Sequence, residues 1–138
     1  MNRSIPSPLI AVVAEIFSSH YTHAQLDNLF LYANAPGVPP EDTKSNKITK
    51  WLFRCNNDLE VDALGVLGKL IENYMEVELP EETPDPWGQA ANLFGGMLTS
   101  PYQLQRGNRD RIVKALGRRG LSYYSGGIIR QSGASGPT

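Results

Sequence analysis

The first half of the chain carries apolar residues at the spacing of amphipathic helices. Ser7 and Pro8 precede the first such stretch, and a serine N-cap followed by proline is a frequent start of a helix. The apolar residues then recur three or four positions apart, which places them on one helical face. We predict a first helix that ends near Ser19 and buries five side chains: Leu9, Val12, Val13, Ile16 and Phe17.

Thr22 and Gln25 mark the start of a second helix. Their spacing is that of a capping box, in which the threonine oxygen and the glutamine side chain bind backbone amides at the helix start. An apolar stripe follows, formed by Leu26, Leu29, Phe30 and Ala33. Residues 34–43 contain three prolines and one glycine, which stop the helix and predict a stiff, extended connection.

A third helix is predicted from about Ser45 to Asn56, and its two faces differ in charge. Its apolar residues share one face, which we expect to be buried: Ile48, Trp51, Leu52 and Cys55. Four cations lie largely on the other side: Lys44, Lys47, Lys50 and Arg54. This arrangement predicts an exposed basic face.

A fourth helix follows, with Asn57 or Asp58 as its N-cap. Its apolar residues again recur at helical spacing: Leu64, Leu67, Leu70, Ile71 and Tyr74. Gly65 and Gly68 lie inside this helix, and each costs up to about 1 kcal/mol relative to alanine. Two interpretations stay open for these glycines, since either another backbone approaches closely or they are tolerated on the surface.

The helical pattern weakens between residues 77 and 105, where several prolines and a Gly-Gly pair interrupt it. We predict one short helix there, near residues 87–98. A last helix is expected to begin after Asn108 as its N-cap and to end before Gly120, which stands where a left-handed residue is favoured. Its buried side is expected to hold Ile112, Val113 and Leu116.

The helical period ends at this point of the chain. Residues 121–124 and 128–131 are β-prone and flank Ser-Gly-Gly, a composition typical of a tight hairpin turn. Residues 132–138 are small and polar and are expected to form a flexible tail or linker. The predicted fold is therefore mainly α, a bundle of five to six helices with a short C-terminal β-hairpin, and residues 1–131 are expected to form one helical interaction domain.

Composition narrows the class of protein. A chain of 138 residues with 41% hydrophobic residues is expected to fold around a single core. Cys55 is the only cysteine, so no internal disulfide can form, and the N-terminus lacks the pattern of a signal peptide. No apolar run reaches the roughly 18 residues of a membrane span. We therefore expect a cytoplasmic protein with no membrane partner.

The net charge of -1 hides a polarised distribution. Residues 72–85 contain six carboxylates and no cation, whereas residues 106–130 contain seven cations and one carboxylate. Such blocks are most often solvated faces, but they also mark surfaces that bind partners. Besides the third helix with Lys47, Lys50 and Arg54, ten residues are candidates for such contacts: Glu78, Glu81, Glu82, Arg109, Arg111, Lys114, Arg118, Arg119, Tyr123 and Tyr124.

The residues form no recognisable catalytic or metal site. His20 and His23 are the only histidines, and neither a second cysteine nor a nearby carboxylate cluster completes a set of metal ligands. Cys55 lies on the apolar face of its helix and is expected to be a core residue. The sequence contains no G-x-S-x-G motif and no complete phosphate-binding loop. We expect no enzyme activity, cofactor, metal or small-molecule substrate.

Binding to nucleic acid is the main alternative to a protein contact. A basic helix followed directly by a hairpin has the order of a recognition helix and wing. Arg111, Lys114 and Arg118 share the helical face opposite the apolar residues, as they do in any amphipathic helix. The pattern therefore fits a nucleic-acid surface, a protein-binding surface and an ordinary solvated face.

Four strings along the chain carry a family resemblance: L-F-x-Y-A-x-A-P-G at Leu29–Gly37, W-L-x-R-x-N at Trp51–Asn56, L-G-K-L-I-E at Leu67–Glu72 and G-L-x-Y-x-x-G-G-x-I at Gly120–Ile129. They resemble the N-terminal module of bacterial abortive-infection proteins. The resemblance spans roughly residues 6–130. Proteins of this family are multidomain phage-defence proteins, in which such a segment precedes a C-terminal HEPN-like helical domain.

The resemblance implies a recognition or adaptor role for this segment. HEPN ribonucleases carry an arginine followed a few residues later by a histidine, and the chain has no such pair. Any toxic activity would then belong to an effector outside this segment. The implied partner is an effector domain or protein, or a second copy, as in helical adaptors of the death-fold kind. Opposed acidic and basic segments would suit head-to-tail association.

Overall fold

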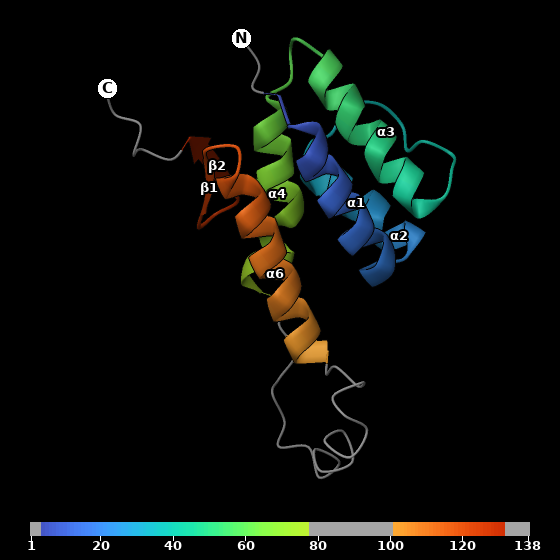
Figure 1. Ribbon diagram of the computed structural model, residues 1–138. Coiled ribbons are helices and arrows are strands. Elements are labelled where there is room, and N and C mark those ends of the chain that lie inside the picture. The colour runs from blue at the N-terminus through green and yellow to red at the C-terminus, as the bar shows by residue number, and fades with distance from the viewer. Residues whose placement is uncertain (1–3, 78–100, 132–138) are drawn as a thin grey trace.

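The computed structural model describes residues 4–77 and 101–131, and within these ranges it is mainly helical with one β-hairpin (Figure 1). The prediction of a mainly α fold with a C-terminal hairpin is therefore confirmed. The elements are α1 (Ser7–His20), α2 (His23–Tyr32), α3 (Lys44–Asn57), α4 (Ala63–Glu76), α6 (Pro101–Gly117), β1 (Leu121–Tyr124) and β2 (Ile128–Gln131).

Helix α1 lies at the centre of the bundle. It packs against α3 on one side and α6 on the other, while α4 packs against α2, α3 and the strand β2 (Figure 1). The apolar faces predicted for α1, α3 and α4 all contribute to one continuous core. Phe30 of α2 stacks on Trp51 of α3 with ring centroids 4.3 Å apart, which joins the two helices on either side of the proline-rich connection.

The helix starts were predicted with mixed success. Thr22 and Gln25 form the predicted capping box, which is confirmed. The N-cap of α1 is Pro6 rather than Ser7, which is already the first helical residue. Asn57 and Asp58 do not begin α4, because they belong to the end of α3, and Asp62 is the N-cap of α4 but its side chain does not make the capping hydrogen bond.

Helix α6 begins at Pro101, seven residues before the predicted N-cap Asn108. Proline is tolerated in the first turn of a helix, because its missing N–H would have no intrahelical partner there. Gln105 and Arg109 both donate to the carbonyl oxygen of Tyr74, at 3.2 and 2.7 Å, and so attach the first half of α6 to α4. This contact explains why the helix continues through Gly107 and Asn108.

The hairpin has the predicted strands and turn. Leu121 pairs with Gln131 and Tyr124 with Ile128 in antiparallel register. Gly126 and Gly127 adopt φ of +90° and +74°, a conformation that favours glycine, and Gly120 has a φ of +71° at the end of α6 as predicted. The turn between the strands is therefore a place where the backbone requires glycine.

Gly68 of α4 lies directly under this turn. A Cβ atom on Gly68 would overlap the carbonyl oxygen of Gly127, so the interpretation of a close backbone approach is confirmed for Gly68. Gly65 meets only the side chain of Asp62. Lys69 donates to the carbonyl oxygen of Gly126 at 2.9 Å, which fastens the turn to α4 next to the contact with Gly68.

Several predictions concern parts of the chain outside the described residues. These are the short helix near residues 87–98, the tail at residues 132–138 and three candidate carboxylates: Glu78, Glu81 and Glu82.

Candidate interaction surface

The basic residues predicted on the outer face of α3 are largely used within the fold. Lys47 is buried, with its side chain 6% exposed, and its ammonium group lies 2.8 Å from the carboxylate of Asp27 on α2. The prediction that Lys47 is exposed is therefore wrong. A lysine at the edge of an apolar face can be buried when a carboxylate from another helix pairs with its charge.

The other three cations of α3 also bind groups nearby. Arg54 is half-buried and donates to the carbonyl oxygens of Pro36 and Val38, at 3.0 and 2.7 Å. Lys44 donates to the carbonyl oxygen of Tyr21, and Lys50 pairs with Asp42 at 2.6 Å. The hydrogen bond from Lys50 is the main cause that lowers the pKa of Asp42 to about 2. An exposed, unpaired basic face does not exist on α3.

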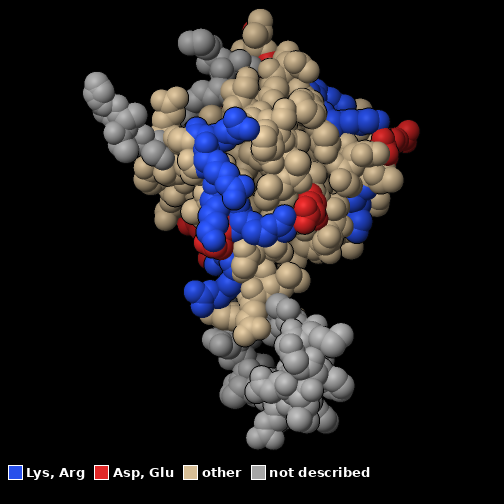
Figure 2. All heavy atoms as spheres, in the orientation of Figure 1, with Lys and Arg blue, Asp and Glu red and all other residues tan. Residues whose placement is uncertain are grey.

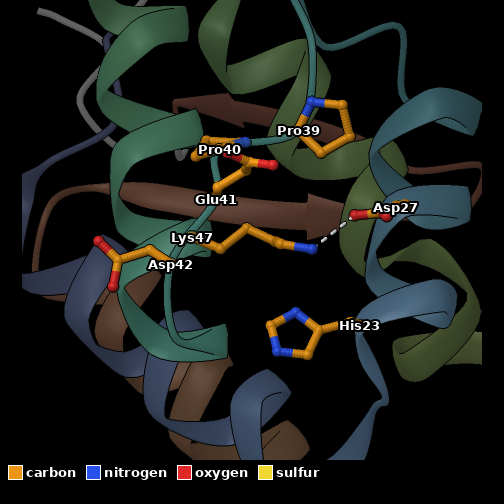
Figure 3. A pocket seen from close by; sticks show the side chains of 7 residues that line it. All are labelled: His23, Asp27, Pro39, Pro40, Glu41, Asp42 and Lys47. Atoms are coloured by element: carbon orange, nitrogen blue, oxygen red, sulfur yellow. Dashed lines mark hydrogen bonds and ion pairs between the residues drawn. The ribbon is translucent and has the colours of Figure 1, made fainter.

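A hollow of about 520 Å³ lies beside the pair of Lys47 and Asp27 (Figure 3). Lys47 from α3 and Asp27 from α2 point toward each other, and the ring of His23 lies next to them (Figure 3). Pro39 and Pro40 belong to the same hollow. Glu41 and Asp42 line it as well. Asp27 matches the charge of Lys47 and Lys50 matches that of Asp42, so the carboxylate of Glu41 is the lining charge for which the described residues show no ion pair.

The helical part of α6 carries cations that are paired with acidic neighbours. Arg111 lies 3.0 Å from Glu15 of α1, and Lys114 lies 2.9 Å from Asp110. All four side chains are well exposed, so these pairs contribute little to stability. Val113, predicted to be buried, is 49% exposed, whereas Ala115 is buried beside Ile112 and Leu116.

Arg109 has a structural role, because its guanidinium group is half-buried against the end of α4. Its Nε atom donates to the carbonyl oxygen of Tyr74, and its Nη2 atom is buried without a hydrogen-bond partner among the described residues. Arg109 therefore does not belong to the exposed basic surface on which the sequence placed it.

Like the exposed Arg130 of β2, Arg118 and Arg119 make no ion pair with a described residue. They lie in the turn between α6 and β1, which we name the basic turn, and both are exposed. Within residues 4–77 and 101–131, neither arginine makes an ion pair or hydrogen bond through its side chain. Figure 2 shows lysine and arginine side chains in an almost unbroken band along α6. The basic turn and this band form one cationic surface.

Tyr123 and Tyr124 point to opposite sides of the hairpin. Tyr123 is partly buried and donates to the carboxylate of Glu76, which also accepts the backbone N–H of Gly126 at 3.0 Å. These two hydrogen bonds lower the pKa of Glu76, while burial and the same carboxylate raise the pKa of Tyr123. Tyr123 therefore anchors the hairpin to α4, and Tyr124, 46% exposed, is the tyrosine that a partner can contact.

Three acidic residues outside the predicted candidates bind groups of other elements. Glu15, Asp27 and Glu76 each accept a group from another element. The spacing of Asp110 and Lys114, four residues apart, could have indicated their pair from the sequence. No sequence signal connects Glu15 with Arg111, because the two residues lie on helices far apart along the chain.

The thiol of Cys55 lies in the interior of the fold. Cys55 is buried, as predicted, and burial raises the pKa of its thiol to about 11, so that the reactive thiolate is disfavoured. Among the residues described here, no group of three histidine, cysteine or acidic side chains is arranged to hold a metal ion. In residues 4–77 and 101–131, every helix is too short or too polar to cross a membrane.

Comparison with known proteins adds no relative: no protein-family model, no curated protein and no solved structure matches the chain.

Proposed function

We propose that this chain is a non-catalytic recognition module that binds an acidic protein partner through its basic turn. The observation that carries the proposal is the difference in pairing between cations. Arg118 and Arg119 are exposed and pair with no other described residue, whereas the cations of α3 bind carbonyl oxygens and carboxylates of the fold. Charge that the fold does not use is available to a partner.

The resemblance to abortive-infection proteins supplies the biological setting of the proposal. The module acts in the cytoplasm of a bacterium as an adaptor of a phage-defence system. Its partner is an effector domain or protein, or a second copy of the chain. The contact is between proteins and involves no turnover by the module itself.

Nucleic acid is the rival partner, and the same residues would bind it. An extended phosphate backbone requires many unpaired cations, since each phosphate contact adds to the affinity. Here Glu15 and Asp110 stand among the cations of α6 and pair with Arg111 and Lys114. These carboxylates repel phosphates and favour a protein partner, which can place its own charges to match.

Phage challenge of bacteria that carry the native gene tests the proposal. We expect the double charge reversal Arg118→Glu with Arg119→Glu to abolish protection, measured as plaque number, at an unchanged level of protein. The matched control is Lys50→Glu, which reverses an exposed cation on α3 and should leave protection intact. Protection by the double variant at the wild-type level would refute the proposed role of the basic turn.

Fluorescence anisotropy with labelled DNA and RNA distinguishes a protein-binding module from a nucleic-acid sensor. A surface that contacts six to ten phosphates loses roughly 10³–10⁵ in affinity between 50 and 200 mM salt. We expect the purified chain to bind both nucleic acids weakly and without such a steep dependence on salt. A steep dependence that disappears in the Arg118→Glu, Arg119→Glu variant would establish the nucleic-acid sensor instead.

A further inference from the structure

Two hollows lie on either side of Arg119. The first, of about 360 Å³, is formed with Arg118 and with apolar atoms of α1 and α6, from Pro8, Val12 and Ala115. Val12 is only partly buried against the core, so its side chain is accessible from this hollow. The lining of the first hollow therefore combines apolar side chains with two arginines.

The second hollow, of about 300 Å³, lies between the N-terminal segment, α4 and the hairpin. It is lined by three polar residues, Ser4, Arg119 and Gln131, and by the apolar side chains of Pro6, Leu64 and Leu121. Both hollows are at the lower end of the roughly 300–1,000 Å³ of small-molecule pockets. Arg119 is the residue that the two hollows share.

We infer that the basic turn and these two hollows bind an extended acidic segment of a partner protein, in which apolar side chains accompany the carboxylates. The inference rests on the proposed function and names the chemistry of its partner. The guanidinium groups of Arg118 and Arg119 match carboxylates, with which arginine forms bidentate hydrogen bonds. The apolar side chains that line the two hollows pack against those of the segment, whose burial adds affinity that charge alone does not supply.

The apolar side chains that line the hollows also distinguish this partner from nucleic acid. A phosphate backbone carries no apolar side chains, so Val12, Leu64 and Leu121 would add nothing to its binding. The chain itself contains a stretch of the required composition at residues 77–85, VELPEETPD, which holds four carboxylates, a valine and a leucine. A free peptide of this sequence is therefore a suitable probe.

Fluorescence anisotropy of the labelled peptide VELPEETPD with the purified chain tests the inference. We expect saturable binding that Arg119→Glu weakens at least about tenfold, because one matched charge becomes a repelling one. Lys50→Glu is the control and should not change the affinity, since Lys50 lies on α3 and pairs with Asp42. Because Arg119 is exposed, its replacement leaves the fold intact, which circular dichroism verifies.

Two altered peptides separate the contributions of charge and apolar contact. SESPEETPD retains the charges without the valine and leucine, and VQLPQQTPN retains the apolar residues without the charges. Both should bind at least about tenfold more weakly than VELPEETPD. Equal binding of SESPEETPD, or no saturable binding of VELPEETPD, would overturn the inference while leaving the phage-challenge result, and with it the proposed function, untouched.

Discussion

Helix α3 and the basic turn both carry cations, but in the described part of the chain the cations of α3 bind groups within the fold and those of the basic turn do not. Lys47 of α3 is buried against Asp27, and Arg54 donates to two carbonyl oxygens of the proline-rich connection. Arg118 and Arg119 have no such acceptors among the described residues. The difference lies in the surroundings, because α3 borders a loop that exposes carbonyl oxygens and carboxylates, whereas the basic turn borders apolar side chains.

This comparison teaches that a run of basic residues indicates a binding surface only after the acceptors around it are known. A lysine that pairs with a carboxylate inside the fold contributes to stability, so its replacement lowers the free energy of unfolding. An arginine that the fold leaves unpaired contributes little to stability and can serve a partner at no cost to the native state. Substitutions in α3 should therefore change stability, whereas substitutions in the basic turn should change the binding of a partner.

The largest effect is expected from Gly68→Ala, which disturbs the support of the basic turn. The new Cβ overlaps the carbonyl oxygen of Gly127, so the hairpin must move away from α4, at a cost of about 3 kcal/mol. Urea unfolding measures the loss. Gly65→Ala is the control: its Cβ would lie 2.9 Å from the side chain of Asp62, which can move aside more easily than backbone, so this variant should cost clearly less than Gly68→Ala. A similar loss in both variants would contradict the close approach at Gly68.

Asp27→Ala should come next, because it leaves the buried ammonium group of Lys47 without its partner. We expect a loss of about 1–3 kcal/mol in the free energy of unfolding. Lys47→Met should cost less, since it removes the buried charge and leaves Asp27, whose side chain is 40% exposed, in contact with water. If Asp27→Ala were as stable as the wild type, the pair with Asp27 would not stabilise the fold. Lys47 would then not differ in this respect from the arginines of the basic turn.

Arg54→Ala is expected to cost about 1–2 kcal/mol through its two hydrogen bonds to the proline-rich connection. Arg54→Lys should not restore the loss, because one ammonium group cannot reproduce the geometry of the guanidinium fork. Thermal unfolding of both variants gives the answer. Full recovery in Arg54→Lys would show that charge, rather than geometry, is what the connection requires.

The attachment of the hairpin should depend on pH in a defined direction. Glu76 has a lowered pKa in the folded chain, so it stabilises the fold above its unfolded pKa, and this contribution is lost as the pH falls through the folded value. Tyr123 has a raised pKa, so its contribution is present below about 10 and lost as the pH rises through the folded value.

NMR titration of Glu76 checks this link. In Tyr123→Phe the pKa of Glu76 should rise toward the ordinary value for glutamate, because the largest cause of its depression is removed. Amide exchange at Gly126 should become faster in the same variant at acidic pH. An unchanged pKa of Glu76 would show that Tyr123 does not anchor the hairpin.

The smallest effect is expected from Arg118→Ala with Arg119→Ala. The free energy of unfolding should stay within about 0.5 kcal/mol of the wild type, since neither side chain is paired with a described residue. Chemical denaturation measures this, with Lys50→Ala as an exposed but paired reference. A loss of 2 kcal/mol or more, roughly the cost of a broken buried contact, would show that the basic turn is structural like α3.

The sequence predicted the helix faces and the hairpin well, because both follow from local periodicity. The faces of Ile16, Leu52 and Leu67 are buried as their spacing indicates, and the turn at Gly126 and Gly127 requires the residues that stand there. Helix boundaries were less predictable. Asn108 has the chemistry of an N-cap, but the contact of Gln105 and Arg109 with α4 keeps this stretch helical, and that contact is not local.

The candidate surface was predictable only in part for the same reason. The sequence identified Arg118 and Arg119 together with Lys47, Arg54 and Arg109, and nothing local separates the free cations from the paired ones. Lys47 is buried because α2 brings Asp27 beside it, and Arg109 is half-buried because α4 presents a carbonyl oxygen. The pairing of a cation depends on which elements meet in space.

The reactivity of Cys55 reports how often helix α3 detaches from the core. This cysteine is the single thiol of the sequence, it lies fully buried where α3 meets the core, and burial raises its pKa to about 11. A thiol reagent at neutral pH can modify it only while α3 is detached from the core. The rate of modification therefore measures how often that detachment occurs, and binding of a partner that holds the bundle closed would slow the labelling without any added probe.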